Sequence, residues 1–270
     1  MISYPNAKIN FGLNILSKRD DGFHEIESVF YPVDWKDILE IVPVGNGYGS
    51  AEFRFSGIDI PHTTDGNLCE RAYRILHSDF DLPSVNIHLH KIIPIGAGLG
   101  GGSADATFTL KMLNKLFELQ LKKEQLEKYA AQLGSDCPFF VDNKPKLVTG
   151  RGDQMESIDV NLSGYKLVLV NPGIHIGTAE AYRNVNLRTP EYSLSSLLIS
   201  APGKWKGKIE NAFEASLFPS HPQIAELKQA LYDKGALYAS MTGSGSTVFG
   251  VFQKDEIELS GFEGMMLRVY

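Results

Sequence analysis

Five glycines lie within seven consecutive positions of the segment PIGAGLGGGSA, residues 94–104. The preceding residues, 85–90, alternate between apolar and polar side chains, which is typical of a β-strand. Apolar side chains then recur every three or four positions over residues 106–117, which predicts a helix that begins at Ser103 or Ala104. The order of strand, glycine-rich loop and helix is the strongest constraint on the fold.

Such a loop is suited to binding a phosphate group. Glycines let the backbone approach a ligand closely, and the first turn of a helix offers unpaired N–H groups with a positive dipole. No lysine follows the last glycine before Ser103, so the segment is not a Walker loop. The alternation over residues 85–90 is typical of a half-exposed antiparallel strand, which argues against a dinucleotide-binding fingerprint. A glycine-rich turn without a ligand is the alternative.

The remaining pattern predicts a mixed α+β protein with a domain boundary near residues 150–160. Further strands are expected at 38–42, 52–55, 165–170 and 247–252, and helices at 67–80, from about 124 to 134, and at 222–234.

Composition narrows the possible functions. The chain has 270 residues, 43% hydrophobic and 21% charged, with a net charge of -6. This acidic balance argues against binding of duplex nucleic acid, which needs basic patches. Two cysteines give no disulfide framework, and no apolar run approaches the ~20 residues of a membrane span. We therefore expect a cytoplasmic protein without nucleic-acid or membrane partners.

The glycine segment resembles the ATP loop of the GHMP superfamily of galactokinase, homoserine kinase, mevalonate kinase and phosphomevalonate kinase. Four more motifs, which resemble those of one branch of the superfamily, occur in the same order and extend the resemblance over nearly the whole chain. They are PNAKIN at 5–10, DGFHEI at 21–26, GSDCPFF at 134–140 and TGSGS at 242–246. Within the superfamily, GGGSAD at 100–105 is similar to the branch that phosphorylates a CDP-linked methylerythritol in the non-mevalonate route to isoprenoids.

The resemblance implies a two-lobed fold, with an ATP-binding lobe at 1–153 and a substrate-binding lobe at 154–270. It also implies ATP and Mg²⁺ as cofactors, although the sequence assigns no ligands to the metal. The implied ATP-binding residues are Pro94, Gly96, Gly98, Leu99, Gly100, Gly101, Gly102, Ser103 and Ala104.

The resemblance also implies the catalytic pair. Asp136 is the expected general base, which would deprotonate the 2-hydroxyl of 4-diphosphocytidyl-2-C-methyl-D-erythritol, and Lys8 is its expected partner. Taken alone, Asp136 is more typical of a turn at a helix end, and Lys8 of an exposed edge strand. An inward-pointing Lys8 needs a partner, because an unpaired buried cation is costly.

The substrate-binding residues follow from the same resemblance. Aromatic side chains and a histidine are expected to hold the cytosine, although Phe23 stands where family members often carry tyrosine. The second glycine loop is expected beside the diphosphate. The full set is Asn10, Phe23, His24, Thr178, Tyr182, Gly243, Ser244 and Gly245. The alternatives are a turn for Asn10, core packing for the aromatics, and a hairpin-like turn for residues 242–246.

Several residues are interpreted as structural. Asn67 precedes a helix and is expected to cap it rather than to contact adenine. His88 and His90 share one strand face but have no nearby Cys or carboxylate cluster, so we expect an exposed face rather than a zinc site. Cys137 has no partner that would make it a nucleophile.

Two rival functions remain open at this point. The first keeps the fold and changes the acceptor, as in mevalonate-type or homoserine kinases or a related ATP-dependent decarboxylase. The second is a catalytically silent nucleotide sensor, against which the intact Lys8 and Asp136 argue. The expected assembly is a monomer or a weak homodimer with a small-molecule substrate and ATP.

Overall fold

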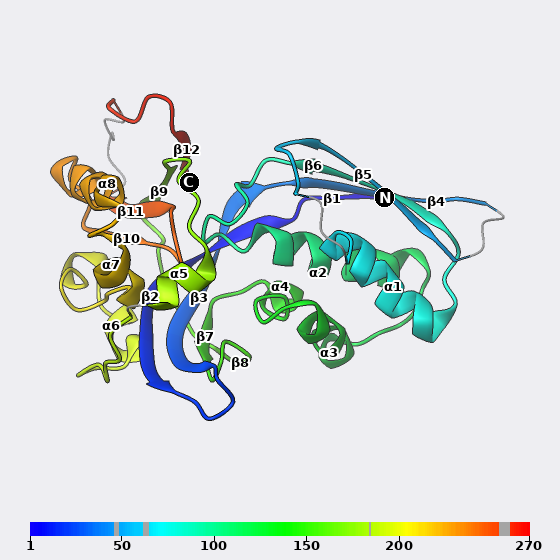
Figure 1. Cartoon of the computed structure of the whole chain (residues 1–270), viewed down its shortest axis with the longest axis horizontal. Helices are drawn as coiled ribbons and strands as arrows, with labels where there is room; N and C mark the ends of the chain where they lie inside the picture. The colour runs from blue at the N-terminus through cyan, green and yellow to red at the C-terminus, as the bar shows by residue number, and fades with distance from the viewer. Residues whose placement is uncertain (46–48, 62–64, 184, 254–259) are drawn as a thin grey trace. The chain divides into compact units, whose positions relative to one another are not determined.

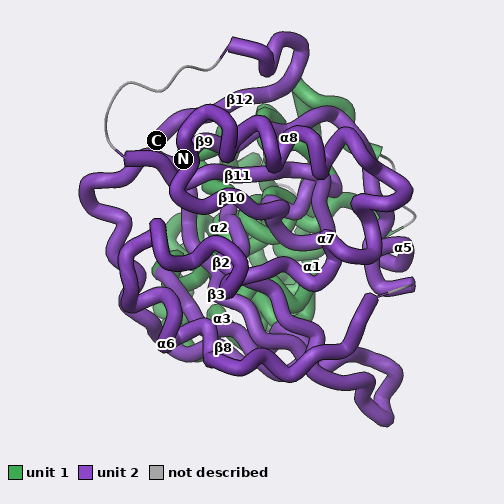
Figure 2. The backbone as a smooth tube through the Cα atoms, turned by 90° about the vertical axis from the view of Figure 1, so that its left-hand side faces the viewer, with its two compact units in different colours: residues 1–7, 34–95, 100–144 green, residues 8–33, 96–99, 145–270 purple. Residues whose placement is uncertain are grey.

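The computed structural model describes residues 1–45, 49–61, 65–183, 185–253 and 260–270. Two compact units divide the chain, each assembled from three segments (Figure 2). Unit 1 contains Met1–Ala7, Asp34–Ile95 and Gly100–Lys144, and unit 2 contains Lys8–Val33, Gly96–Leu99 and Pro145–Tyr270. The lobes at 1–153 and 154–270 stay a prediction.

Unit 1 contains a four-stranded sheet in the order β1-β4-β6-β5 (Figure 1). The bounds are β1 Ile2–Ser3, β4 Ile38–Pro43, β5 Ala51–Gly57 and β6 Val85–Lys91. In β6, Val85, Ile87 and Leu89 are buried and Asn86 and His88 are exposed, as the alternation predicts. The expected antiparallel setting is half wrong, because β6 is an inner strand, antiparallel to β4 but parallel to β5. The alternation of apolar and polar side chains shows that one face of the strand is exposed to solvent. It does not show whether the neighbouring strand is parallel or antiparallel.

Helices pack on the apolar face of this sheet and close the core of unit 1. Their bounds are α1 Leu68–Phe80, α2 Gly101–Leu116, α3 Lys123–Leu133 and α4 Phe139–Asp142. Leu39 and Ile87 of the sheet share one buried cluster with Leu76 of α1 and Leu110 of α2. Asn67 caps α1 through a reciprocal capping box with Glu70, which confirms the interpretation of that residue.

Unit 2 contains two further sheets, in the orders β2-β3-β7-β8 and β10-β11-β9-β12. The strands are β2 Asn6–Lys18, β3 His24–Lys36, β7 Lys146–Thr149, β8 Gln154–Ser157, β9 Tyr165–Asn171, β10 Tyr238–Met241, β11 Val248–Gln253 and β12 Met266–Val269. The first residues of β2 and the last of β3 are counted with unit 1. Antiparallel pairing of β10 with β11 brings Met241 opposite Val248, so residues 242–247 form the connection between them.

The helices of unit 2 are short, apart from α8. They are α5 Thr178–Arg183, α6 Leu194–Leu198, a 3₁₀ turn at Pro202–Lys204, α7 Ala212–Leu217 and α8 Pro222–Asp233. Phe213 of α7 and Leu227 of α8 join Val168 and Val248 of the sheet in a second buried cluster. In the described part of the chain, every helix is too short or too polar to span a membrane.

Candidate active site

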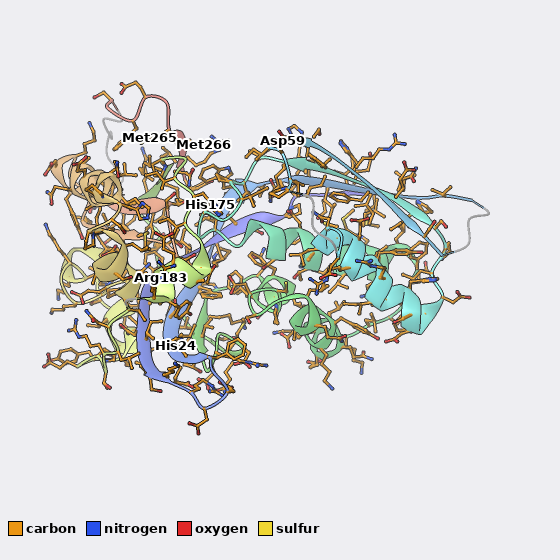
Figure 3. All side chains as sticks on the ribbon, in the orientation of Figure 1. His24, Asp59, His175, Arg183, Met265 and Met266 are labelled. Carbon is orange, nitrogen blue, oxygen red and sulfur yellow. The ribbon has the colours of Figure 1, made fainter. Side chains whose placement is uncertain are left out.

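The glycine loop owes its spacing to backbone conformation. Gly96, Gly98 and Gly100 have φ angles of +64°, +76° and +67°, in the left-handed region that favours glycine. At Gly96 the space is also restricted, because a Cβ there would lie 2.9 Å from the ring of His175 (Figure 3). Every second residue from Gly96 to Gly100 therefore has a left-handed backbone conformation, which explains the Gly-x-Gly-x-Gly pattern. A flexible linker would not require glycine at these particular positions.

The loop leaves its hydrogen-bond donors available. Within the described residues, none of the backbone N–H groups from Ile95 to Ser103 donates a hydrogen bond. Native proteins pair the great majority of buried N–H groups, so such a run points to water or a ligand as the partner. A phosphate group has the acceptor oxygens that these donors need.

Helix α2 begins at Gly101, two residues before the predicted start at Ser103. Its N-cap is Gly100, which has no side chain to bond the first turn, so the amides of that turn stay open. A Cβ on Gly101 would lie 2.8 Å from Ile93 and 2.9 Å from Lys91 Nζ, which explains that glycine by packing. Among the described residues, a Cβ on Gly102 would meet only Leu68, at an ordinary 3.6 Å. Packing against these residues therefore does not require a glycine at position 102.

A buried charge network lies behind the first turn of α2. Lys91 Nζ donates to Asp37 at 2.5 Å and to Asp105 at 2.8 Å, and all three side chains are at most 3% exposed. Asp37 also accepts the N–H groups of Ile92 and Ile93, which fixes the chain as it enters the loop. Burial raises the pKa of Asp105 to about 7, with Asp37 adding to the rise and Lys91 opposing it. The motifs and periodicity of the sequence did not predict this network.

Lys8 and Asn10 lie on one face of β2, as predicted. Lys8 is 4% exposed, its Nζ donates to Asn10 Oδ1 at 2.7 Å, and it lies 4.2 Å from the centre of the Phe30 ring. Asn10 donates in turn to Ser28 Oγ at 2.8 Å. The lysine is therefore a buried, oriented cation and not an exposed edge-strand residue.

Asp136 lies in the turn between α3 and α4 and is half-buried. The N–H of Cys137 donates to the carbonyl of Gly134 across this turn, so α3 ends at the predicted glycine. Burial raises the pKa of Cys137 to about 11, which keeps the thiol protonated at neutral pH. This agrees with the interpretation that Cys137 is no nucleophile.

Within unit 2, Thr242 joins the second glycine loop to the segment Gly96–Leu99 of the first. Its hydroxyl accepts the N–H of Asn10 at 2.9 Å and donates to the carbonyl of Gly98 at 3.1 Å. Within the described residues, the N–H groups of Gly243, Ser244 and Ser246 donate no hydrogen bond, whereas that of Gly245 closes the turn onto Thr242. The second loop thus offers a further set of donors.

The structure brings together part of the predicted cytosine site. His24, which is labelled in Figure 3, stacks on Tyr182 with ring centres 4.8 Å apart and an interplanar angle of 25°. Tyr182 in turn packs edge-on against Phe213. Phe23 is 53% exposed and has the guanidinium of Arg151 over its ring, 5.3 Å from the ring centre. Thr178 is the exposed first residue of α5. An aromatic pair is therefore present, but it is formed by His24 with Tyr182.

The rings of His88 and His90 share one hydrogen-bond partner, the hydroxyl of Ser56. His88 Nε2 and His90 Nδ1 lie 3.1 and 2.9 Å from the hydroxyl of Ser56. Across the described ranges, no group of three or more His, Cys, Asp or Glu side chains could hold a metal ion.

Comparison with known proteins decides the family. Residues 67–144 match the model of the GHMP kinase N-terminal domain, and residues 198–259 match that of the GHMP kinase C-terminal domain. The chain belongs to the GHMP kinase family. This GHMP kinase is thus a small-molecule kinase with the α+β fold of its family, as its motifs predict.

Relatives of this GHMP kinase match it over nearly its full length. A Bacteroides fragilis protein is 48% identical over 95% of this chain and 93% of its own length. An Azobacteroides pseudotrichonymphae protein is 49% identical over 94% of each chain. Both are named 4-diphosphocytidyl-2-C-methyl-D-erythritol kinase. A crystal structure of 4-(cytidine 5'-diphospho)-2C-methyl-D-erythritol kinase is 30% identical, with a TM-score of 0.78 over 93% of this chain and 90% of the other.

Proposed function

We propose that this GHMP kinase transfers the γ-phosphoryl group of ATP to the 2-hydroxyl of 4-diphosphocytidyl-2-C-methyl-D-erythritol. The products are the 2-phosphate and ADP, in the non-mevalonate route to isopentenyl diphosphate. The observation that carries the proposal is the identity of 48–49% over 94–95% of the chain with two kinases named for this substrate. The geometry of each unit supports the individual steps.

ATP binds to the loop at residues 94–104. The open N–H groups from Ile95 to Ser103 and the uncapped start of α2 supply donors for its phosphate oxygens. These donors are fixed by backbone turns, so they need little reorganisation as charge develops on the transferred group. Packing against the described residues does not explain the glycine at position 102, which supports close approach of the ligand at that position.

Asp136 accepts the proton of the 2-hydroxyl. The oxygen then attacks the γ-phosphorus, the bond from that phosphorus to the β,γ-bridging oxygen breaks, and ADP leaves. Lys8 stabilises the charge that develops on the attacking oxygen, and Asn10 fixes the lysine through the 2.7 Å hydrogen bond. The proposal requires Lys8 and Asp136 to reach the same hydroxyl in the substrate complex.

The CDP part of the substrate binds to residues of unit 2. Tyr182 stacks on the cytosine, His24 reads its polar edge, and Phe23 supplies a second aromatic face. The free donors of Gly243 and Ser244 bind the diphosphate, while Asn10, Thr178 and Gly245 complete the contacts. Because His24 stacks on Tyr182 in the structure, entry of the base requires these two rings to separate.

Mg²⁺ is the expected companion of ATP, whose phosphate charge it would neutralise. The described residues provide no acidic cluster for it, so we assign it no protein ligands and derive no step through it. The division into an ATP lobe at 1–153 and a substrate lobe at 154–270, a cytoplasmic location, and a monomer or weak homodimer are further parts of the proposal. Sedimentation velocity tests the assembly.

Phosphorus NMR of the purified protein with Mg-ATP and 4-diphosphocytidyl-2-C-methyl-D-erythritol tests the reaction. We expect a new phosphomonoester resonance that grows together with ADP. Parallel samples with mevalonate or homoserine as acceptor should show none. Phosphorylation of either of these, or ATP binding without any product, would overturn the assigned acceptor.

A further inference from the structure

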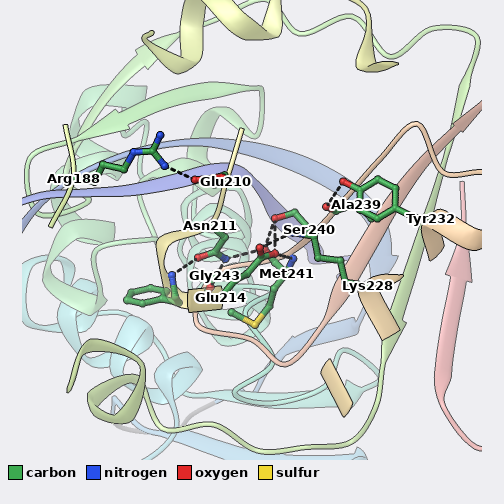
Figure 4. Close-up of polar contacts among 11 residues, drawn as sticks. Arg188, Glu210, Asn211, Glu214, Lys228, Tyr232, Ala239, Ser240, Met241 and Gly243 are labelled. Carbon is green, nitrogen blue, oxygen red and sulfur yellow. Dashed lines mark hydrogen bonds and ion pairs between the residues drawn. The ribbon is translucent and has the colours of Figure 1, made fainter. Parts of the chain in front are cut away.

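The sequence at the start of helix α7 predicts a capping box, but Glu214 bonds to another segment of the chain. Asn211, Ala212, Phe213 and Glu214 have the spacing of a capping box, in which the fourth residue bonds back to the N-cap amide. Asn211 does cap the helix, since its Oδ1 accepts the N–H of Phe213, the second residue of α7, at 3.0 Å. Glu214 instead accepts the N–H of Met241 at 2.8 Å and the hydroxyl of Ser240 at 3.1 Å (Figure 4).

The amide nitrogen of Asn211 completes the contact with the same segment. Its Nδ2 donates to the carbonyls of Met241 and Gly243, each at 2.8 Å. Both backbone polar groups of Met241, the residue that ends β10, are therefore held by side chains of α7. Asn211 is 3% exposed, so these bonds lie in a nearly water-free environment that strengthens them.

The other sides of this segment are fixed as well. The start of α7 is attached to β2, because Leu13 donates its N–H to the carbonyl of Glu210 at 2.9 Å and pairs with Asn211 in a parallel bridge. The hydroxyl of Thr242 bonds to Asn10 and Gly98. The free N–H groups of Gly243 and Ser244 thus extend from a backbone that is held by α7 on one side and by β2 on the other.

We infer that Asn211 and Glu214 are positioning residues for phosphoryl transfer, which set the conformation of the loop Thr242–Ser246. This inference rests on the proposed function, in which that loop binds the substrate diphosphate. Hydrogen-bond donors stabilise the transition state best when they already point to the atoms on which charge develops. A misplacement of about 1 Å can lower the rate about 10²-fold. Neither side chain needs to touch the substrate.

Substitutions at Asn211 separate the cap from the loop contact. Asn211→Ser and Asn211→Asp keep an oxygen that caps α7, since serine and aspartate are as good N-caps as asparagine. Both lose the two N–H donors, and the aspartate also brings a negative charge against two carbonyl oxygens. We expect kcat per folded molecule to fall about 10- to 10²-fold in both, most in Asn211→Asp, with an unchanged KM for ATP.

Glu214 offers rescue by a conservative change. Glu214→Gln keeps an acceptor oxygen for the Met241 N–H and loses the 2.6 Å ion pair of the other carboxylate oxygen with Lys228. If the contact with Met241 positions the loop, Glu214→Gln should keep far more of kcat than Glu214→Ala, which loses both contacts. The matched control is Ser193→Ala, which removes the N-cap of α6 in the same unit and should leave kcat unchanged. Circular dichroism and thermal unfolding give the folded fraction by which each kcat is divided.

A second readout does not depend on turnover. In ¹⁵N spectra, the amide resonances of Gly243, Ser244 and Gly245 should shift in Asn211→Ser and Glu214→Ala but stay in place in Glu214→Gln and Ser193→Ala. Unmoved resonances in Asn211→Ser, or a wild-type kcat in Asn211→Asp, would overturn the positioning role. An inactive wild type with shifted resonances would instead reject the proposed substrate and leave the structural role of Asn211 supported.

Discussion

Gly98 packs against the peptide of Thr242 so closely that a Cβ on Gly98 would overlap the Thr242 carbonyl oxygen. In return, a Cβ on Gly243 would lie 3.0 Å from the Cα of Gly98. Within unit 2, the segment Gly96–Leu99 of the first glycine loop and the second glycine loop therefore touch through their backbones, with the Thr242 hydroxyl bonded across the contact. Neither loop can change conformation without disturbing the other.

Gly98→Ala should destabilise the fold. Its φ of +76° costs an L-residue about 1–2 kcal/mol, and the overlap with Thr242 adds to that cost. We expect a loss of at least about 2 kcal/mol in the free energy of unfolding, measured by urea titration. An alanine variant as stable as the wild type would show that the loops do not pack in this way.

Gly102→Ala should have opposite effects on stability and on ATP binding. The position is helical, and of the residues that the structure describes a Cβ there meets only Leu68, at 3.6 Å, so alanine should stabilise α2 by up to about 1 kcal/mol. The same methyl group would occupy space that the nucleotide needs. Urea titration and ATP titration calorimetry of one sample measure both effects, and unchanged ATP affinity would remove residue 102 from the ATP site.

Asp136→Asn should cut kcat by about 10²- to 10⁴-fold, because the amide cannot accept the proton of the substrate hydroxyl. ATP affinity should barely change. Steady-state kinetics and calorimetry measure the two quantities, with Asp233→Asn at the exposed end of α8 as the control for loss of a carboxylate. Near-normal turnover would exclude Asp136 as the general base.

Tyr182→Ala should raise the KM for the cytidine substrate by roughly 5- to 150-fold, which corresponds to about 1–3 kcal/mol of lost base stacking. Tyr182→Phe keeps the ring and should stay near the wild-type KM. If alanine lowers stability but leaves KM unchanged, Tyr182 belongs to the packing around Phe213 and not to the substrate site.

The stability of unit 1 should depend on pH through Asp105. Its pKa is raised from the ordinary 3.8 to about 7 in the folded protein, where it lies beside Asp37 and Lys91. The folded state then binds this proton more tightly than the unfolded state. The contribution of Asp105 to stability is thus largest below about pH 4, falls as pH rises towards 7, and is constant above that.

Comparison of wild type with Asp105→Asn isolates this effect from other carboxylates. Urea unfolding at several values between pH 4 and 8 should give a difference in unfolding free energy that changes by up to about 1.4 kcal/mol per pH unit below pH 7. A difference that is independent of pH would show that Asp105 is ionised throughout.

The sequence predicts local elements well where periodicity and end signals agree. The helix after Asn67, the strand at 85–90 and the end of α3 at Gly134 all follow from such signals. The predicted start of α2 is too late, because consecutive glycines favour a loop in a sequence-based prediction. In the structure, Gly100 in a left-handed conformation is the N-cap and the helix begins at Gly101. The family resemblance, and not periodicity, supplied the roles proposed for Lys8 and Asp136.

Contacts between distant segments could not be predicted in this way. Nothing in the local sequence couples Asp37 to Lys91 and Asp105, because their network depends on how β6 packs against α2. The spacing of Asn211 and Glu214 does signal a helix start, and α7 could have been found from it. That Glu214 bonds to Met241 instead of its own N-cap is decided by tertiary packing.

The conformation of the pentapeptide TGSGS therefore depends on residues outside it. Its shape comes from side chains some 30 positions earlier, at Asn211 and Glu214, and from a hydroxyl bonded to Asn10 and Gly98. In a hairpin of another protein, these five residues would lack the contacts that direct the N–H groups of Gly243 and Ser244. A designer who wants the loop must also transfer the first turn of α7 and the strand that supports it.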